Sequence, residues 1–101
     1  MEGQGKQSIE LTRQEGEEFR SVRLSVSAAG LRLSAQDIGA AAQRVWGRDE
    51  HEAWVDVSGA AVPALVLALL KEKFAGRSDA VEAFRDFCRL NGIPHAFDTW
   101  P

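Results

Sequence analysis

The stretch FRSVRLSVSAAGLRL, residues 19–33, decides the fold. Val22, Leu24 and Val26 alternate with arginine and serine, so they point to one side of an extended chain. A period of two with β-branched residues is typical of a half-buried strand. Small residues and Gly30 then permit a turn, after which the alternation resumes. The stretch therefore predicts a β-hairpin.

Extended segments also flank this hairpin on both sides. Residues 7–11 predict a short strand with Ile9 and Leu11 on one face. Residues 51–57 alternate again and predict a strand, bounded by serine and glycine. The side chains of that strand expected to face a core are Ala53, Val55 and Val57.

The segment 34–47 is ambiguous. Ser34 stands where a helix cap is expected, and Gly47 is a natural helix stop. Gly39 opposes a helix, because glycine in a helix interior is destabilising. We predict a short helix and leave helix and extended structure open for residues 35–46.

Two helices are predicted in the C-terminal part. Apolar residues in 62–74 recur at spacings of three and four, which is typical of a helix with one buried side. Ser78 is expected to cap a second helix. Leu69 and Phe84 lie on the apolar sides of these helices, so we predict that both are core residues.

The order of these elements predicts an α+β fold. It consists of a small antiparallel sheet with two C-terminal helices packed on one face and a strand at the C-terminus, over residues 93–100. Pro94 would make that strand an edge strand. Residues 1–6 are expected to form a flexible terminus and residues 7–101 a single domain.

The composition limits the classes of partner and the cellular compartment that we expect. Twelve Lys and Arg face fifteen Asp and Glu, a net charge of -3, which argues against nucleic acid as a partner. The longest apolar run, residues 60–70, is too short to cross a bilayer, so no membrane partner is expected. Cys88 is the only cysteine and residues 1–6 are polar, which favours a cytoplasmic protein.

The residues that carry chemistry are sparse. His51, Cys88 and His95 are far apart and the chain has no CxxC, so no metal or cofactor is expected. Cys88, His95 and Asp98 could form a nucleophilic triad on paper, but Cys88 lies on the apolar side of its helix. We therefore expect no enzyme. A small enzyme using Cys88 or the carboxylates is the weakest alternative.

The acidic strand around Trp54 is the clearest candidate for a functional site. Alternation places its side chain on one face with three carboxylates, and a rim of acids around an aromatic residue suits a basic protein partner. A solvated charged face is the alternative interpretation. The candidate partner-binding residues are Asp49, Glu50, Glu52, Trp54 and Asp56.

Four stretches carry a resemblance to a known group of proteins. They are WGRDEHEAWV (46–55), LLKEKF (69–74), FCRLNGIP (87–94) and FDTW (97–100). Together they resemble small bacterial immunity proteins, the antitoxins encoded beside polymorphic or contact-dependent growth-inhibition toxins. The similarity spans about residues 30–100.

The family pattern WGxxEYEY, EKF and NGIxxxFxSW is followed with departures. His51 and Ala53 replace the aromatic residues of EYEY, and Thr99 replaces the serine before the last tryptophan. These departures bear on which partner would be bound. The resemblance implies a protein that neutralises a toxin domain, often a nuclease with a basic active site. An interaction module with an unrelated partner is the second hypothesis, and the oligomeric state is not predicted.

Overall fold

The computed structural model describes residues 5–101 and has an α+β fold, as predicted. Within those residues an open antiparallel sheet of four strands is joined by three α-helices. The elements in chain order are β1 (Gln7–Gln14), β2 (Phe19–Ser27), β3 (Gly30–Ile38), α1 (Ala40–Trp46), β4 (Glu50–Ser58), the 3-10 turn η1 (Gly59–Ala61), α2 (Val62–Phe74) and α3 (Ala80–Leu90).

The chain divides into a sheet unit that ends at Leu65 and a helical unit, Val66–Pro101. The packing of helices on one face of the sheet and the single domain over residues 7–101 stay predictions. Of the segment 1–6 expected to be flexible, residues 1–4 lie outside the described residues.

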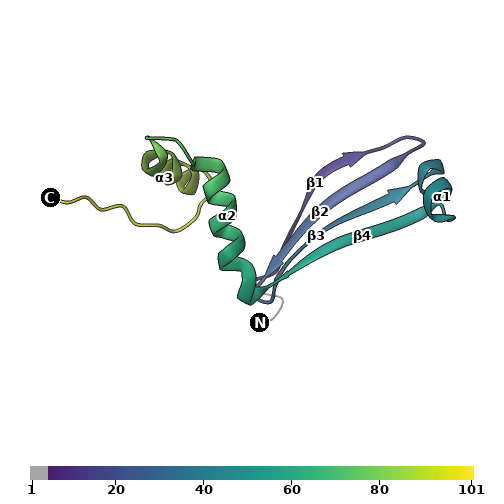
Figure 1. The fold of residues 1–101 in the computed structure, drawn as a ribbon, viewed down its shortest axis with the longest axis horizontal. Helices are drawn as coiled ribbons and strands as arrows, with labels where there is room; N and C mark the ends of the chain where they lie inside the picture. Colours follow the sequence, from purple (N-terminus) through teal and green to yellow (C-terminus); the bar gives the residue numbers. More distant parts are fainter. Residues whose placement is uncertain (1–4) are drawn as a thin grey trace. The chain divides into compact units, whose positions relative to one another are not determined.

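The strands lie side by side in chain order, each antiparallel to the next (Figure 1). Leu24 is opposite Leu33, and Leu33 is opposite Val55, so the predicted alternation is confirmed. Successive side chains of a strand point to opposite sides of the sheet. The register therefore defines an apolar face, made of Ile9, Val22, Leu24, Val26, Leu31, Leu33, Ala35, Ala53, Val55 and Val57.

The opposite side of the sheet is the polar face. It carries serine, charged and amide side chains along most of its length, with Trp54 among them. Its members are Ser8, Glu10, Arg13, Phe19, Ser21, Arg23, Ser25, Arg32, Ser34, Gln36, Ile38, Glu50, Glu52, Trp54 and Asp56.

The turn between β2 and β3 depends on Gly30. Its φ is 140°, a conformation that side chains rarely adopt. A Cβ atom at this position would also collide with the carbonyl oxygen of Val57. Glycine therefore lets β4 pair with β3 up to the end of the hairpin.

Strand β1 is longer than predicted and contains an irregularity. The register shifts between Glu10 and Thr12, so Ile9 is opposite Leu24 while Leu11 has no opposite residue. The strand is therefore irregular at Leu11, and the shared face of Ile9 and Leu11 stays a prediction. A β-bulge interrupts the period of two, which short sequence windows do not reveal.

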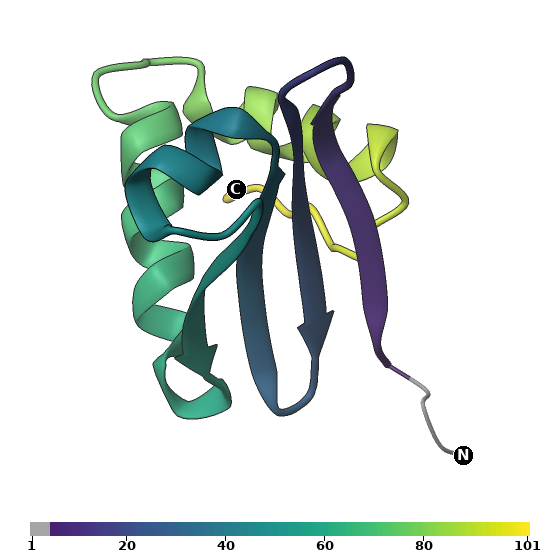
Figure 2. The ribbon, with the colours of Figure 1, turned by 90° about the vertical axis from the view of Figure 1, so that its right-hand side faces the viewer.

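The ambiguous segment contains both kinds of structure. β3 continues to Ile38, so the predicted helix from Ser34 is wrong over its first part, and α1 begins at Ala40. Gly39, with a φ of 141°, separates the two elements, and Gly47 ends α1 in the left-handed conformation as predicted. Figure 2 shows α1 over one end of the sheet, where it contacts β3 and β4.

In the helical unit, both predicted helices are present. Phe74 and Phe84 meet edge to face, with ring centroids 5.9 Å apart. Asp79, and not the predicted Ser78, is the N-cap residue of α3. Leu69 and Phe84 are 53% and 41% exposed, and because the packing of the helices on the sheet stays a prediction, their place in a core stays a prediction as well. Among the described residues, no helix is long and apolar enough to span a membrane.

The predicted C-terminal strand is absent from the described chain, since residues 93–101 form no regular element. The chain turns at Gly92, and the Ile93 N–H donates to the Cys88 carbonyl over 2.9 Å. The Arg85 guanidinium then lies 4.3 Å from the centroid of the Phe97 ring. Contacts with α3 thus replace strand pairing, in which Pro94 could not donate a hydrogen bond.

Candidate protein-binding site on the polar face

The predicted binding residues of β4 share one face. Glu50, Glu52, Trp54 and Asp56 are opposite Ile38, Gln36, Ser34 and Arg32 of β3. All of the β4 residues in this set are exposed, and Trp54 retains 52% of its accessible surface. Asp49 is also exposed but precedes the strand, and its carbonyl accepts a 2.9 Å hydrogen bond from the Gly39 N–H.

Arg32 organises the centre of this surface. Its Nε donates to Asp56 Oδ1 over 2.6 Å, and its Nη2 donates to Asp56 Oδ2 over 3.0 Å. The same guanidinium carbon lies 5.0 Å from the centroid of the Trp54 ring, within cation–π range. One arginine therefore neutralises a candidate acid and packs on the candidate aromatic anchor.

This pairing also shifts the pKa of both side chains. Hydrogen bonds from Arg32 lower the pKa of Asp56, and hydrogen bonding to Asp56 raises the pKa of Arg32. In each case the hydrogen bond outweighs the opposing desolvation. Asp56 is thus held ionised, and its charge is directed at Arg32.

The polar face carries side chains of both charges, whereas the sequence of β4 alone suggested an acidic surface. Beside Arg32, β2 contributes Arg23, whose Nη2 donates to Ser8 Oγ over 3.5 Å. On β1, Glu10 accepts a 2.6 Å hydrogen bond from Ser21 Oγ and lies 3.3 Å from Arg13 Nε. The neighbouring strands therefore add basic groups that a view of residues 47–57 alone omits.

Unpaired acids remain at one end of this surface. Among the residues that the structure describes, Asp49, Glu50 and Glu52 form no ion pair. Glu50 and Glu52 lie at the start of β4, Asp49 directly precedes it, and the paired Asp56 lies toward its other end. The negative character of the face is therefore concentrated near α1.

Sequence reasoning missed Arg32, although the sequence contained a signal. Arg32 alternates with Leu31 and Leu33, which places it on the polar side of that strand. Its pairing with Asp56 required knowing that the strand at residues 51–57 pairs with the strand at residues 31–33. That neighbour relation comes from the strand order, which the alternation of single strands does not specify.

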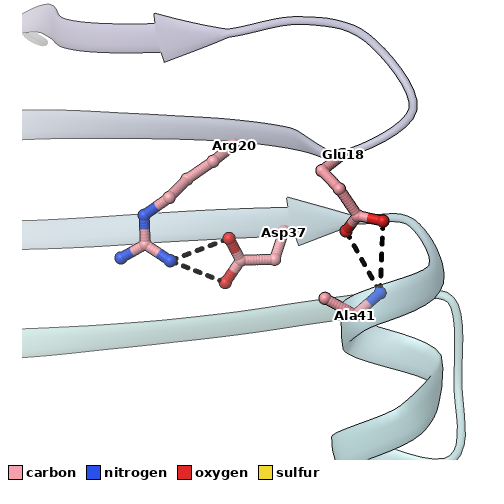
Figure 3. Close-up of polar contacts among 4 residues, drawn as sticks. All are labelled: Glu18, Arg20, Asp37 and Ala41. Carbon is pink, nitrogen blue, oxygen red and sulfur yellow. Dashed lines mark hydrogen bonds and ion pairs between the residues drawn. The ribbon is translucent and has the colours of Figure 1, made fainter.

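A second cluster lies where α1 meets the sheet (Figure 3). Arg20 Nη1 donates to both Asp37 carboxylate oxygens over 2.8 and 2.9 Å, and Glu18 accepts from the Ala40 and Ala41 N–H groups over 3.1 Å. A hollow of about 320 Å³ adjoins these groups. Because each charged group already has a partner, the cluster explains how α1 is attached to the sheet.

Cys88, His95 and Asp98, which could form a triad on paper, belong to the helical unit. Cys88 is 3% exposed, as predicted for a buried thiol, and His95 Nδ1 lies 2.8 Å from the Ile93 carbonyl. Over residues 5–101, no group of three or more His, Cys, Asp or Glu side chains is placed to hold a metal ion. The candidate carboxylates of β4 lie on an open sheet surface, an arrangement suited to contact with a macromolecule.

In comparisons with known proteins, no family model, curated protein or solved structure matches this chain.

Proposed function

We propose that this chain is a non-catalytic protein that binds and neutralises a cognate toxin domain through the polar face of its sheet. The observation that carries the proposal is Trp54, an indole 52% exposed in the middle of β4 and surrounded by charged side chains. Tryptophan is enriched among the few residues that supply most of the energy of protein interfaces. The resemblance to immunity proteins supports a toxin as the partner.

The contacts of Trp54 support a role as an anchor. Asp56 holds the Arg32 guanidinium through two hydrogen bonds, and that guanidinium packs on the indole. A side chain ordered before binding loses less conformational entropy in the complex. The indole is therefore partly preorganised and keeps half of its surface for a partner.

The unpaired acids support a partner with a basic surface. Glu50 and Glu52 lie at one end of the polar face and Asp49 directly precedes them, and none of the three forms an ion pair with another described residue. Charges of this kind act mainly on the rate of association, because they attract a partner before contact. A nuclease domain with a basic active site has suitable charge for this surface.

The test begins with the product of the gene directly upstream, co-expressed with this chain in a growth assay. Wild-type protein should restore growth and co-purify with that product. Trp54→Ala should weaken the complex by about 2–4 kcal/mol, mainly through faster dissociation. Trp46→Ala is the matched control, because Trp46 is 49% exposed and stacks on His51, which belongs to the other side of the sheet.

Equal weakening by both tryptophan changes would contradict the polar face as the binding surface. Failure of the wild type to restore growth, with binding to a different protein, would favour the interaction module with an unrelated partner.

The role of the acids is tested by reversing Glu50 and Glu52 to lysine. We expect a slower association rate and a weaker dependence of that rate on salt, with little change in dissociation. The control with the same change in net charge is Glu72→Lys with Glu82→Lys, at exposed positions on α2 and α3. Unchanged rates in the β4 variant at low salt would mean that these acids are only a solvated surface.

A further inference from the structure

We propose that the free edge of β4 accepts an extended, basic segment of the partner protein as an additional strand. β4 is the last strand in the sheet order, and it pairs only with β3 among the described residues. An unpaired edge presents a row of backbone donors and acceptors to which another chain can pair. The proposal depends on which groups face that edge, on its regularity and on its charge.

The register identifies the backbone groups that face outward. The Gly39 N–H donates to the Asp49 carbonyl, and the Gly59 N–H donates to the Ala29 carbonyl, so residues 49 and 59 direct these groups toward β3. Backbone direction alternates along a strand. The even-numbered residues between them therefore direct N–H and C=O groups to the free edge: Glu50, Glu52, Trp54, Asp56 and Ser58.

The two edges of the sheet differ in regularity. β1 forms the other edge, and its register shifts between Glu10 and Thr12, which breaks the row of outward groups. The register of β4 with β3 is continuous from Glu50 to Ser58, and β4 contains no proline. α1 contacts β4, and Trp46 stacks on His51 near its start, so the stretch from Glu52 to Ser58 is best placed to pair.

Charge selects the occupant of this edge. A second copy pairing antiparallel in the register with greatest overlap would place Trp54 opposite Trp54 and Glu52 opposite Asp56. Like charges directly opposite each other destabilise a strand pair, to the extent that Arg32 does not neutralise Asp56. A segment with lysine or arginine at alternate positions would instead face these acids with opposite charge. The edge therefore favours a basic partner segment over a second copy of this chain.

The same residues link the edge to the polar face. Even-numbered residues of β4 direct their backbone groups to the free edge and their side chains to the polar face. Alternate side chains of an added strand would therefore lie beside Trp54, and the remaining side chains would lie beside Val55 and Val57. The inference rests on the proposed binding function, but a synthetic segment tests the edge without any toxin.

The probe is a synthetic peptide of alternating lysine and valine, as long as the nine residues of β4. A peptide of alternating glutamate and valine is the control. Amide hydrogen exchange of the full chain is followed by NMR. At a peptide concentration ten times its Kd, exchange of the Glu52, Trp54 and Asp56 amides should slow by about tenfold. The glutamate peptide should give no such protection.

A backbone variant tests the edge directly. The Glu52 N–H faces outward, so Glu52→Pro removes an edge donor without removing a hydrogen bond to β3. Circular dichroism checks that this variant folds. We expect it to lose the protection by the lysine peptide, whereas Glu52→Gln should keep it with a smaller dependence on salt.

Three results would overturn the proposal. Peptide binding without protection of the even-numbered β4 amides would place the site elsewhere. Unchanged protection in folded Glu52→Pro would exclude pairing at this edge. Protection that rises with protein concentration in the absence of peptide would show that a second copy occupies it. None of these results depends on the growth assay. Strand addition at the edge of β4 can therefore be disproved while the proposed toxin binding is still supported.

Discussion

The two faces of one sheet are stabilised in different ways. On the polar face, side chains bind one another: Ser21 is 7% exposed and donates to Glu10, and Arg32 pairs with Asp56. On the apolar face, Leu33 and Val55 are 41% and 64% exposed. Polar side chains can be satisfied by a neighbour within the face, whereas apolar side chains gain stability only by removal from water.

This difference indicates which face of the sheet contributes to stability and which face is available for binding. The row Leu24, Leu33 and Val55 crosses three strands, so it contributes to holding them in register. Trp54 lies on the other side of the same strands, with an arginine as its partner. We expect changes on the apolar face to alter the free energy of unfolding, and changes on the polar face to alter binding.

The largest effect on stability is expected from Leu33→Ala. Leu33 lies in the third strand and faces Leu24 and Val55, so its truncation removes apolar contacts on both sides. Because it is partly exposed, we expect a loss of about 2 kcal/mol, at the low end for Leu→Ala. Urea unfolding followed by circular dichroism measures this loss.

Ser34→Ala is the matched control, since Ser34 is the next residue and belongs to the polar face. A change within about 0.5 kcal/mol is expected there. Equal losses for the two variants would mean that the faces do not differ in their contribution to stability.

A smaller effect on stability is expected from Trp54→Ala. The indole is half exposed, and its described partner is the Arg32 guanidinium. Exposed cation–π pairs contribute about 0.5–1 kcal/mol, so the free energy of unfolding should fall by no more than about 1 kcal/mol. A loss as large as that of Leu33→Ala, measured by the same urea titration, would identify Trp54 as a structural residue.

The strands were predictable because their pattern is local. Apolar and polar residues alternate over residues 22–27, and Ala53, Val55 and Val57 recur at every second position, and a period of two needs no knowledge of other strands. The bulge in β1 was not predictable in this way, because it exists only relative to β2. Likewise Ser34 suggested a helix cap, but pairing with Arg23 and Trp54 keeps it in a strand. Tertiary pairing overrides such local signals.

The candidate site was predictable only in part, for the same reason. Alternation correctly placed Glu52, Trp54 and Asp56 on one face, since that needs one strand. The net charge of the face needs all four strands, because Arg13, Arg23 and Arg32 come from the three strands beside β4. The α1 cap is also non-local, because Glu18 precedes β2 and binds N–H groups beyond β3.

The smallest effect is the titration of Asp56, and it tests whether the polar face pairs its charges in solution. Hydrogen bonds from Arg32 lower the pKa of Asp56, so its carboxyl should titrate below the ordinary aspartate value of about 3.9. A carboxyl with a depressed pKa in the folded state stabilises that state above the unfolded pKa. The contribution is lost as pH falls through the folded pKa, below about pH 4. Both side chains are exposed, so added salt should reduce the shift.

NMR detection of the Asp56 carboxyl carbon during an acid titration measures this shift, and Arg32→Gln should return the pKa toward the ordinary value. Asp79, whose pKa is lowered mainly by its hydrogen bonds with Arg77 in the helical unit, is an internal control that Arg32→Gln should leave unchanged. If Asp56 titrates at the ordinary value in the wild type, Arg32 does not hold it in solution. The face would then present Asp56 as a further unpaired acid beside Trp54 and leave Arg32 available to a partner. Binding of a partner by the polar face would then cost more conformational entropy, because the guanidinium would no longer order the indole before binding.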